Sequence, residues 1–173
     1  SKGARVLLAP TVNIHRSGLN GRNFECYSED PLLTSMLAVA YIKGLQDNGV
    51  AATIKHFVAN DSEIDRQTIS SDVDERTLRE IYLPPFEAAV KKAGVWAVMT
   101  GYNRLNGVHM DSHKWALQDV MRGEFGYDGI FMSDWFGTNS VADSVNAGHD
   151  LEMPGPTRYR GARLLEAVKA GEV

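Results

Sequence analysis

The sequence predicts an α/β fold built on a parallel sheet, and three observations support this fold class. Short apolar runs alternate along the 173-residue chain with longer segments whose apolar residues recur at helical spacing. No low-complexity stretch or interdomain linker interrupts this alternation. Polar residues collect directly after each apolar run. Strands that alternate with helices pair in parallel and bind ligands at their carboxyl ends, so the chain is predicted to form βαβ units with a site at one edge of the sheet.

The first predicted unit is a strand within residues 5–14 and a helix over residues 31–48. The strand run, RVLLAPTVNI, is almost entirely apolar and ends in a polar loop. Asp30 or Ser28 is the candidate N-cap of the helix, and Gly49 is a candidate residue for its end. The helical stripe consists of Leu33, Leu37, Ala40, Tyr41 and Leu45.

The second predicted unit is a strand over residues 50–60 and a helix over residues 72–92. The helix begins with several acidic residues, which the positive end of the helix dipole favours. Pro84 and Pro85 lie inside the helical pattern. Because proline removes a backbone donor and clashes with the preceding turn, we expect the helix to be kinked or divided there.

The rest of the chain repeats this pattern with shorter elements. Predicted strands occupy residues 95–103 and 129–132, and residues 149–154 form a short fifth strand. Predicted helices occupy residues 112–124, 138–147 and 160–170.

The polar residues at the strand ends are compatible with two parallel architectures. Both a (β/α)₈ barrel and a doubly wound open sheet place ligands there. The sequence has no GxGxxG turn, which weakens a nucleotide-binding open sheet. Five strands are too few to close a barrel, so the chain is predicted to be a partial (β/α)₈ TIM-type barrel of about five βα units. The polar residues are Asn13, His15, Lys55, His56, Asn60, Thr100, Tyr102, Asn103, Ser133, Asp134, Asp150 and Glu152.

Composition excludes several classes of protein. The net charge of −4 gives no general attraction to nucleic acid or to an anionic membrane. A single cysteine, Cys26, excludes an internal disulfide framework and a multi-cysteine zinc site. No apolar run reaches the roughly 18 residues of a membrane span, and the first residues lack the apolar core of a signal peptide. We expect a soluble protein, without a prediction of its compartment.

Five motifs resemble the catalytic domain of glycoside hydrolase family 3, which includes β-glucosidases. They occur in the family's order, and the resemblance runs from about Leu7 to Val173. KHFVANDSE and SDW are most similar to β-glucosidases, and the Pro-Gly-His loop typical of the family's N-acetylglucosaminidases is missing. The motifs are GRNFECYSEDP, ATIKHFVANDSEIDR, DERTLREIYLPPFEAAV, VMTGYNRLNG and GYDGIFMSDW.

The resemblance implies a role for individual residues. The aspartate of SDW is the family's catalytic nucleophile, which makes Asp134 the nucleophile here. Tyr102 lies in a segment where Gly101 replaces the family's usual serine, and its hydroxyl is expected close to Asp134. The predicted substrate-binding residues are Arg22, Lys55, His56, Arg66, Met99, Tyr102 and Trp135.

Each of these residues also has a simpler structural interpretation. Asp134 alone would be a helix N-cap, and Arg22 would pair with Glu25 or Glu29 on the surface. Lys55 and His56 are adjacent in a strand, so one would face away from the site. Arg66 would be a solvated loop residue, and Tyr102 would be a core aromatic. Glu63 and Asp65 are expected at the surface or beside the site.

The resemblance also implies parts of the family's architecture that residues 1–173 do not supply. These are an upstream strand whose aspartate binds the sugar, and a following α/β sandwich domain whose glutamate is the general acid/base. The sequence therefore predicts part of a retaining exo-β-glycosidase, most similar to a β-glucosidase, that is inactive or nearly so on its own. We expect a fragment of a longer protein, or an oligomer that covers the open edges of the sheet.

Other functions remain open from the sequence. A non-catalytic carbohydrate-binding fragment would keep the sugar contacts, and a β-xylosidase of the same family would share the nucleophile. A metal-dependent hydrolase is weaker, because no histidine pair has HxH or HExxH spacing. The expected partner is a small β-glucoside or oligosaccharide, with no cofactor, metal or nucleic acid and a possible homo-oligomer. The candidate metal ligands are His15, His56, His109, Asp134 and His149.

Overall fold

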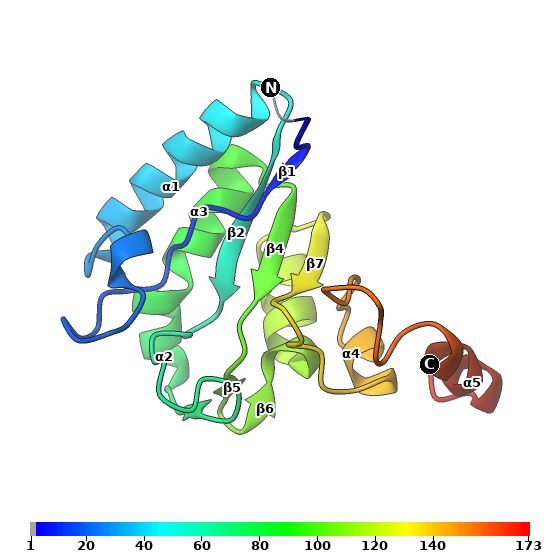
Figure 1. Cartoon of the computed structure of the whole chain (residues 1–173). Coiled ribbons are helices and arrows are strands. Elements are labelled where there is room, and N and C mark those ends of the chain that lie inside the picture. Colours follow the sequence, from blue (N-terminus) through cyan, green and yellow to red (C-terminus); the bar gives the residue numbers. More distant parts are fainter. Residues whose placement is uncertain (1–2) are drawn as a thin grey trace.

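The computed structural model describes residues 3–173, and its centre is a parallel sheet of four strands (Figure 1). The strands lie in chain order, and each neighbouring pair runs parallel with helix between its members. The predicted α/β class is therefore confirmed, and the architecture is that of a partial barrel. The strands are β1 (Val6–Leu7), β2 (Ala51–Phe57), β4 (Ala97–Thr100) and β7 (Ile130–Ser133).

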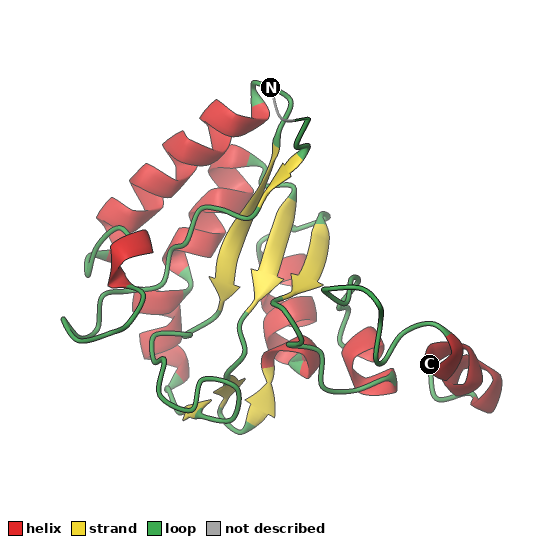
Figure 2. Cartoon of the chain, viewed as in Figure 1, coloured by secondary structure: helices red, strands yellow, loops and turns green. Residues whose placement is uncertain are grey.

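Helices pack against one side of this sheet (Figure 2). The two longest α-helices, α1 and α3, lie against each other beside β2, whereas α5 stands apart near the C-terminus (Figure 1). The α-helices are α1 (Pro31–Gln46), α2 (Glu75–Thr77), α3 (Pro84–Ala93), α4 (Ala142–Asn146) and α5 (Ala162–Ala170). Two segments are π-helical, Leu78–Tyr82 and Trp115–Glu124, and two are 3₁₀ turns, Asn23–Glu25 and Met110–Ser112.

Two predicted helix boundaries are confirmed. The Asp30 carboxylate accepts hydrogen bonds from the backbone N–H groups of Leu32 and Leu33, so Asp30 is the N-cap of α1. The predicted helix over residues 72–92 is divided at Pro84, which is the first residue of α3. Proline suits that position because the first helical N–H has no partner within the helix.

The ends of the chain are less regular than the sequence predicts. The apolar run at residues 5–14 is paired as a strand only at Val6–Leu7, followed by a single bridge from Thr11 to Lys55. The expected fifth strand at residues 149–154 is reduced to one bridge between Leu151 and Met132. Backbone hydrogen bonds still hold this segment against β7, from the N–H of Leu151 to the carbonyl oxygen of Phe131 at 3.0 Å and from the N–H of Ser133 to that of Leu151 at 2.9 Å. Ser133 Oγ also accepts from the N–H of Met153 at 2.8 Å.

A small second sheet was not predicted and lies below the strand ends. It consists of β3 (Ser70–Ser71), β5 (Arg104–Leu105) and β6 (Val108–His109). Its hairpin turns at Asn106 and Gly107, whose φ angles are 49° and 86°. An Asn-Gly pair with positive φ at both residues is the preferred two-residue hairpin turn, so this signal was present in the sequence.

The two faces of the main sheet differ in what they bury. The face toward the helices carries large side chains, and the Phe57 ring meets the Phe86 ring edge-on at 4.9 Å between centroids. The opposite face has a small apolar cluster of Ala97, Met99 and Met132. Two of its residues, Met99 and Met132, directly precede the last residues of β4 and β7.

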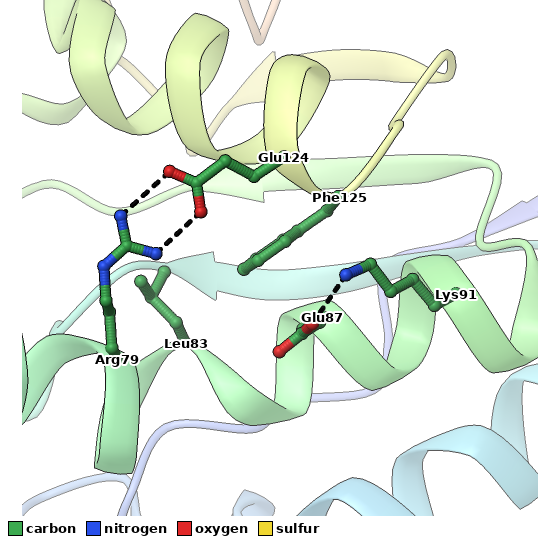
Figure 3. A pocket seen from close by; sticks show the side chains of 6 residues that line it. All are labelled: Arg79, Leu83, Glu87, Lys91, Glu124 and Phe125. Carbon is green, nitrogen blue, oxygen red and sulfur yellow. Dashed lines mark hydrogen bonds and ion pairs between the residues drawn. The ribbon is translucent and has the colours of Figure 1, made fainter.

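Ion pairs connect the outer ends of the helices. Figure 3 shows Arg79 donating two hydrogen bonds to the Glu124 carboxylate, at 2.7 and 2.8 Å, beside a pocket of about 210 Å³. Lys91 pairs with Glu87 on its other side. The Arg79–Glu124 pair joins the helical segments that follow β2 and β4, whereas the Lys91–Glu87 pair lies within α3. Among residues 3–173, no helix has the length and apolar character needed to cross a membrane.

Candidate active site

Asp134 directly follows β7, at the carboxyl end of the sheet. Its Oδ1 accepts the backbone N–H of Trp135 at 2.7 Å, and its Oδ2 lies 3.3 Å from Nε2 of His56. The next helix, α4, begins only at Ala142, so the N-cap interpretation of Asp134 is wrong. The carboxylate is free to face an open site.

Asp134 lines a pocket of about 290 Å³. All eight residues predicted from the sequence line it together, although they come from separate segments of the chain. The sequence analysis missed one lining residue, Leu8, because it is part of the apolar run that follows β1. The lining residues are Leu8, Arg22, Lys55, His56, Arg66, Met99, Tyr102, Asp134 and Trp135.

Glu25 holds the cations on one side of the pocket. It accepts hydrogen bonds from Arg22 Nε and from Thr11 Oγ1, and Lys55 Nζ lies 3.8 Å from it. Burial opposes the charge of Glu25, but the hydrogen bonds from Arg22 and Thr11 outweigh it and lower the pKa of the carboxyl. The ion pair expected as an alternative for Arg22 therefore exists, and it lies at the pocket.

Lys55 and His56 both reach the pocket even though they are neighbours in β2. The pairing register between β2 and β4 shifts between Lys55 and Phe57. Such an irregularity breaks the strict alternation of a strand and can redirect a side chain. The expectation that one of the two residues would face away is therefore wrong.

His56 is almost completely buried, with 2% of its surface exposed. Desolvation lowers its pKa well below the ordinary value, and the charges of Arg22, Lys55 and Arg66 act in the same direction. Burial and these cations therefore favour the neutral form of the imidazole. Besides Asp134, the His56 ring contacts Asn13, which also forms hydrogen bonds with the backbone of His56. The sequence analysis assigned no role to Asn13.

Tyr102 and Arg66 contact each other in the lining of the pocket. The Arg66 guanidinium lies over the Tyr102 ring, 4.8 Å from its centroid, and also pairs with Glu63 at 3.0 Å. Burial and then the nearby Asp134 carboxylate raise the pKa of Tyr102 to about 12. The tyrosine is therefore a protonated donor at neutral pH. Arg66 is fixed by these contacts and is not a freely solvated loop residue.

Apolar side chains complete the pocket. Met99 is buried on the inner face of β4, whereas Trp135 is 39% exposed. An aromatic surface that is partly open to solvent suits the C–H face of a sugar ring and excludes water from one side of it. The pocket therefore combines hydrogen-bonding cations with an apolar wall.

The charge around Asp134 is mainly positive. Arg22, Lys55 and Arg66 line the same pocket, and Asp134 is the only carboxylate among its described lining residues.

Other candidate residues from the sequence lie elsewhere. Of the five possible metal ligands, only His56 and Asp134 line the pocket, and residues 3–173 hold no group of three or more histidine, cysteine or acidic side chains placed to bind a metal ion. Asp150 pairs with Arg122 outside the pocket. Glu152 instead accepts backbone N–H groups from residues 158–160.

The fold and the pocket define a barrel-type α/β domain with its site at the carboxyl ends of the strands. Comparison with known proteins places this domain in a family: the chain belongs to glycosyl hydrolase family 3, whose N-terminal domain model matches residues 1–173.

Curated relatives and solved structures of β-glucosidases are similar to this chain. A β-glucosidase of Rhizobium radiobacter is 72% identical over 173 residues, which are the whole chain and 21% of that protein. β-Glucosidase 3B of Thermotoga neapolitana, in complex with glucose, has a TM-score of 0.95 at 47% identity, over 99% of this chain and 25% of that one. The Kluyveromyces marxianus β-glucosidase complex with glucose has a TM-score of 0.96 at 48% identity, over 98% and 21%. The chain thus spans about a fifth to a quarter of the proteins it matches.

Proposed function

We propose that this chain forms part of the active site of a retaining exo-β-glucosidase, which removes terminal β-D-glucosyl residues. One observation carries the proposal: Asp134 stands at the end of β7 in a pocket whose other polar residues are donors suited to sugar hydroxyls. The family and the similar β-glucosidases support the same activity.

In the proposed mechanism, the Asp134 carboxylate attacks the anomeric carbon of the bound glucoside. A C–O bond forms to Asp134 as the bond to the aglycone breaks, and the departing oxygen takes up a proton. Water then attacks the anomeric carbon, gives one proton back to the group that had protonated the departing oxygen, and releases the Asp134 carboxylate. A retaining enzyme needs a second carboxyl group about 5–5.5 Å from the nucleophile to supply that proton.

The proton donor in this proposal comes from polypeptide outside these residues. Asp134 is the only carboxylate that lines the described pocket, and the nearby Glu25 is unsuitable because its pKa is lowered. A general acid must hold its proton near the working pH. We propose that a second domain of the family architecture places an acidic side chain above Asp134.

The sugar is held from two sides. Arg22 and Lys55 donate to hydroxyls of the glycone, since a guanidinium can grip two neighbouring hydroxyls and an ammonium has three donors. Trp135 covers the apolar face of the ring. His56, which lies next to Asp134, provides a further polar contact to the sugar.

The test measures p-nitrophenyl-β-glucoside turnover by a full-length enzyme that carries these 173 residues, either naturally or in place of the matching segment of the Rhizobium radiobacter relative. Asp134→Asn should lower kcat by about 10⁴-fold or more, because the amide cannot form the ester. Asp65→Asn changes a carboxylate that does not line the pocket, so its kcat should stay near that of the parent enzyme. Near-normal turnover in Asp134→Asn would overturn the proposal.

A further inference from the structure

Asn13 holds His56 by its backbone and by its ring. Its Nδ2 donates to the carbonyl oxygen of His56 at 3.0 Å, and its Oδ1 accepts the backbone N–H of His56 at 3.0 Å. Both side chains are buried, with 5% and 2% of their surfaces exposed. The amide has only one favourable orientation, because a flip would place donor against donor and acceptor against acceptor.

This fixed orientation places the His56 ring between two oxygen atoms. Oδ1 of Asn13 lies 3.2 Å from Nδ1, and Oδ2 of Asp134 lies 3.3 Å from Nε2. An amide oxygen and a carboxylate oxygen can only accept hydrogen bonds, whereas a neutral imidazole has a single N–H. One proton therefore faces two acceptors.

A doubly protonated ring would satisfy both oxygen atoms, but the surroundings oppose it. Burial lowers the pKa of His56, and three cations from separate segments add to that effect: Lys55 on β2, Arg66 in the loop after it, and Arg22 before the 3₁₀ turn. Among residues 3–173, Asp134, which follows β7, is the one anion that pairs with the ring. A neutral ring carries its proton either on Nδ1, toward Asn13, or on Nε2, toward Asp134.

The charge of Asp134 determines which of the two ring nitrogens holds the proton. A hydrogen bond to an ionised acceptor is roughly twice as strong as a bond between neutral groups, so an ionised Asp134 draws the proton to Nε2. Nδ1 then turns a lone pair toward Asn13, which is an unfavourable contact. Once the charge of Asp134 is lost, the amide oxygen of Asn13 becomes the better acceptor and the proton belongs on Nδ1.

We propose that Asn13 is a positioning residue that competes with Asp134 for the single ring proton of His56, so that the tautomer of His56 switches with the charge of Asp134. The exchange takes one proton from Nε2 and returns one to Nδ1, with no net change in charge. A consequence for catalysis rests on the proposed function: formation of the glycosyl ester removes the charge of Asp134, and Nε2 then becomes an acceptor for a sugar hydroxyl.

The direct test records the ring ¹⁵N resonances of the chain labelled with ¹⁵N-histidine, at pH 7. His56 is assigned among the five histidines by loss of its signals in His56→Gln. We expect the Nε2–H tautomer in the parent chain and the Nδ1–H tautomer in Asp134→Ala, a variant that leaves Asn13 and its contacts to the backbone in place. The same tautomer in both proteins, or a doubly protonated His56 at pH 7, would overturn the proposal.

A second test uses the full-length enzyme and separates positioning from a structural role. Asn13→Asp places a carboxylate against Nδ1, which should raise the pKa of His56 and move the pH profile of kcat/KM. Asn103→Asp is the matched control, because Asn103 is equally buried and donates to the carbonyl oxygen of Val58 but does not contact His56. A shifted profile only in Asn13→Asp supports the proposal, whereas an unshifted profile overturns it.

The two proposals can fail separately. The tautomer measurement does not depend on turnover. A tautomer switch in a protein that cleaves no glucoside would leave this inference standing and remove the proposed function. Conversely, an active enzyme with one fixed tautomer would remove only the inference.

Discussion

Glu25 illustrates how single residues prepare the pocket. Arg22 and Lys55 would repel each other and a third cation, Arg66, if no anion lay between them. Glu25 supplies that anion and fixes the direction of the Arg22 guanidinium, while Thr11 donates to its other oxygen at 2.6 Å. The predicted sugar-binding cations therefore depend on a carboxylate that itself does not line the pocket.

Glu25→Gln should weaken sugar binding more than it slows chemistry. The amide keeps the shape of the side chain but loses the charge that holds Arg22 and Lys55. A hydrogen bond to a charged group contributes about 1.5–3 kcal/mol, so we expect KM in the full-length enzyme to rise about tenfold or more, with kcat changed much less. Glu29→Gln is the control, because Glu29 is exposed. A loss confined to kcat would contradict this role for Glu25.

Asp61 gives a prediction for the pH dependence of stability. Burial raises its pKa from 3.8 to about 6, against the smaller opposite effect of Arg16. The folded state therefore binds a proton more tightly than the unfolded state, and stability is lost as pH rises from about 4 through 6.

Asp61→Asn should remove the loss of stability that accompanies the rise in pH. At pH 7 the variant should be more stable than the parent chain by up to about 3 kcal/mol, because one pKa unit corresponds to about 1.4 kcal/mol and the shift is about two units. Urea unfolding at pH 4 and pH 7 measures the effect. Asp65→Asn, in the same loop, should leave the pH dependence as it is. An equal pH dependence in Asp61→Asn and the parent chain would rule out Asp61 as its source.

At the scale of elements, the parallel βαβ arrangement, the N-cap of α1 and the division at Pro84 follow from the sequence. The lengths of the outer strands do not, and the helix predicted over residues 138–147 is reduced to α4. Periodicity locates an apolar run such as residues 5–14, whereas pairing depends on a neighbour that the run itself does not specify. The site residues were found through their motifs and line one pocket, although their roles stay predictions. Asn13 was not assigned a role because its contacts to His56 join residues 43 positions apart in the chain, which spacing does not show. Glu25 was considered only as a surface partner of Arg22, three residues away, and not as a partner of Lys55.

The N-cap of α1 can be tested by itself. Asp30→Ala removes the acceptor for the N–H groups of Leu32 and Leu33, and loss of such a cap costs about 1 kcal/mol. The midpoint of urea unfolding should fall accordingly. Asp47→Ala removes an equal charge at the other end of α1, where a negative charge is unfavourable, and should be neutral or slightly stabilising. An equal fall of the urea midpoint in both variants would contradict the capping role, because it would mean that the loss of negative charge lowers the stability.

At the scale of the molecule, the β1 edge of the sheet pairs with no further strand among residues 3–173, and the β7 edge is covered only by the bridge from Leu151 to Met132. The strands at its edges expose apolar residues, with 48% of Val6 and 51% of Ile130 accessible. α1 also carries an exposed apolar face of Leu32, Leu33, Met36, Leu37 and Tyr41. Unpaired strand edges are sites of further pairing. We propose that further strands of the barrel cover the sheet edges in the complete enzyme.

The isolated 173-residue chain should bind a glucoside weakly and fail to hydrolyse it. Protonation of the leaving group contributes about 10²–10⁴-fold to the rate, and the described pocket holds no second carboxylate. Isothermal titration with glucose beside a turnover assay measures both properties. Robust turnover by the isolated chain would mean that these residues, or a second copy of the chain, supply the acid.

The central claim is that Asp134 is the nucleophile. Its most direct test treats the full-length enzyme with an activated 2-deoxy-2-fluoroglucoside, which slows breakdown of the glycosyl ester, and then locates the attached sugar by peptide mass spectrometry. We predict a single labelled site at Asp134 in the segment GIFMSDWFGT. A sugar attached to another residue, or inactivation without a covalent adduct, would contradict the account.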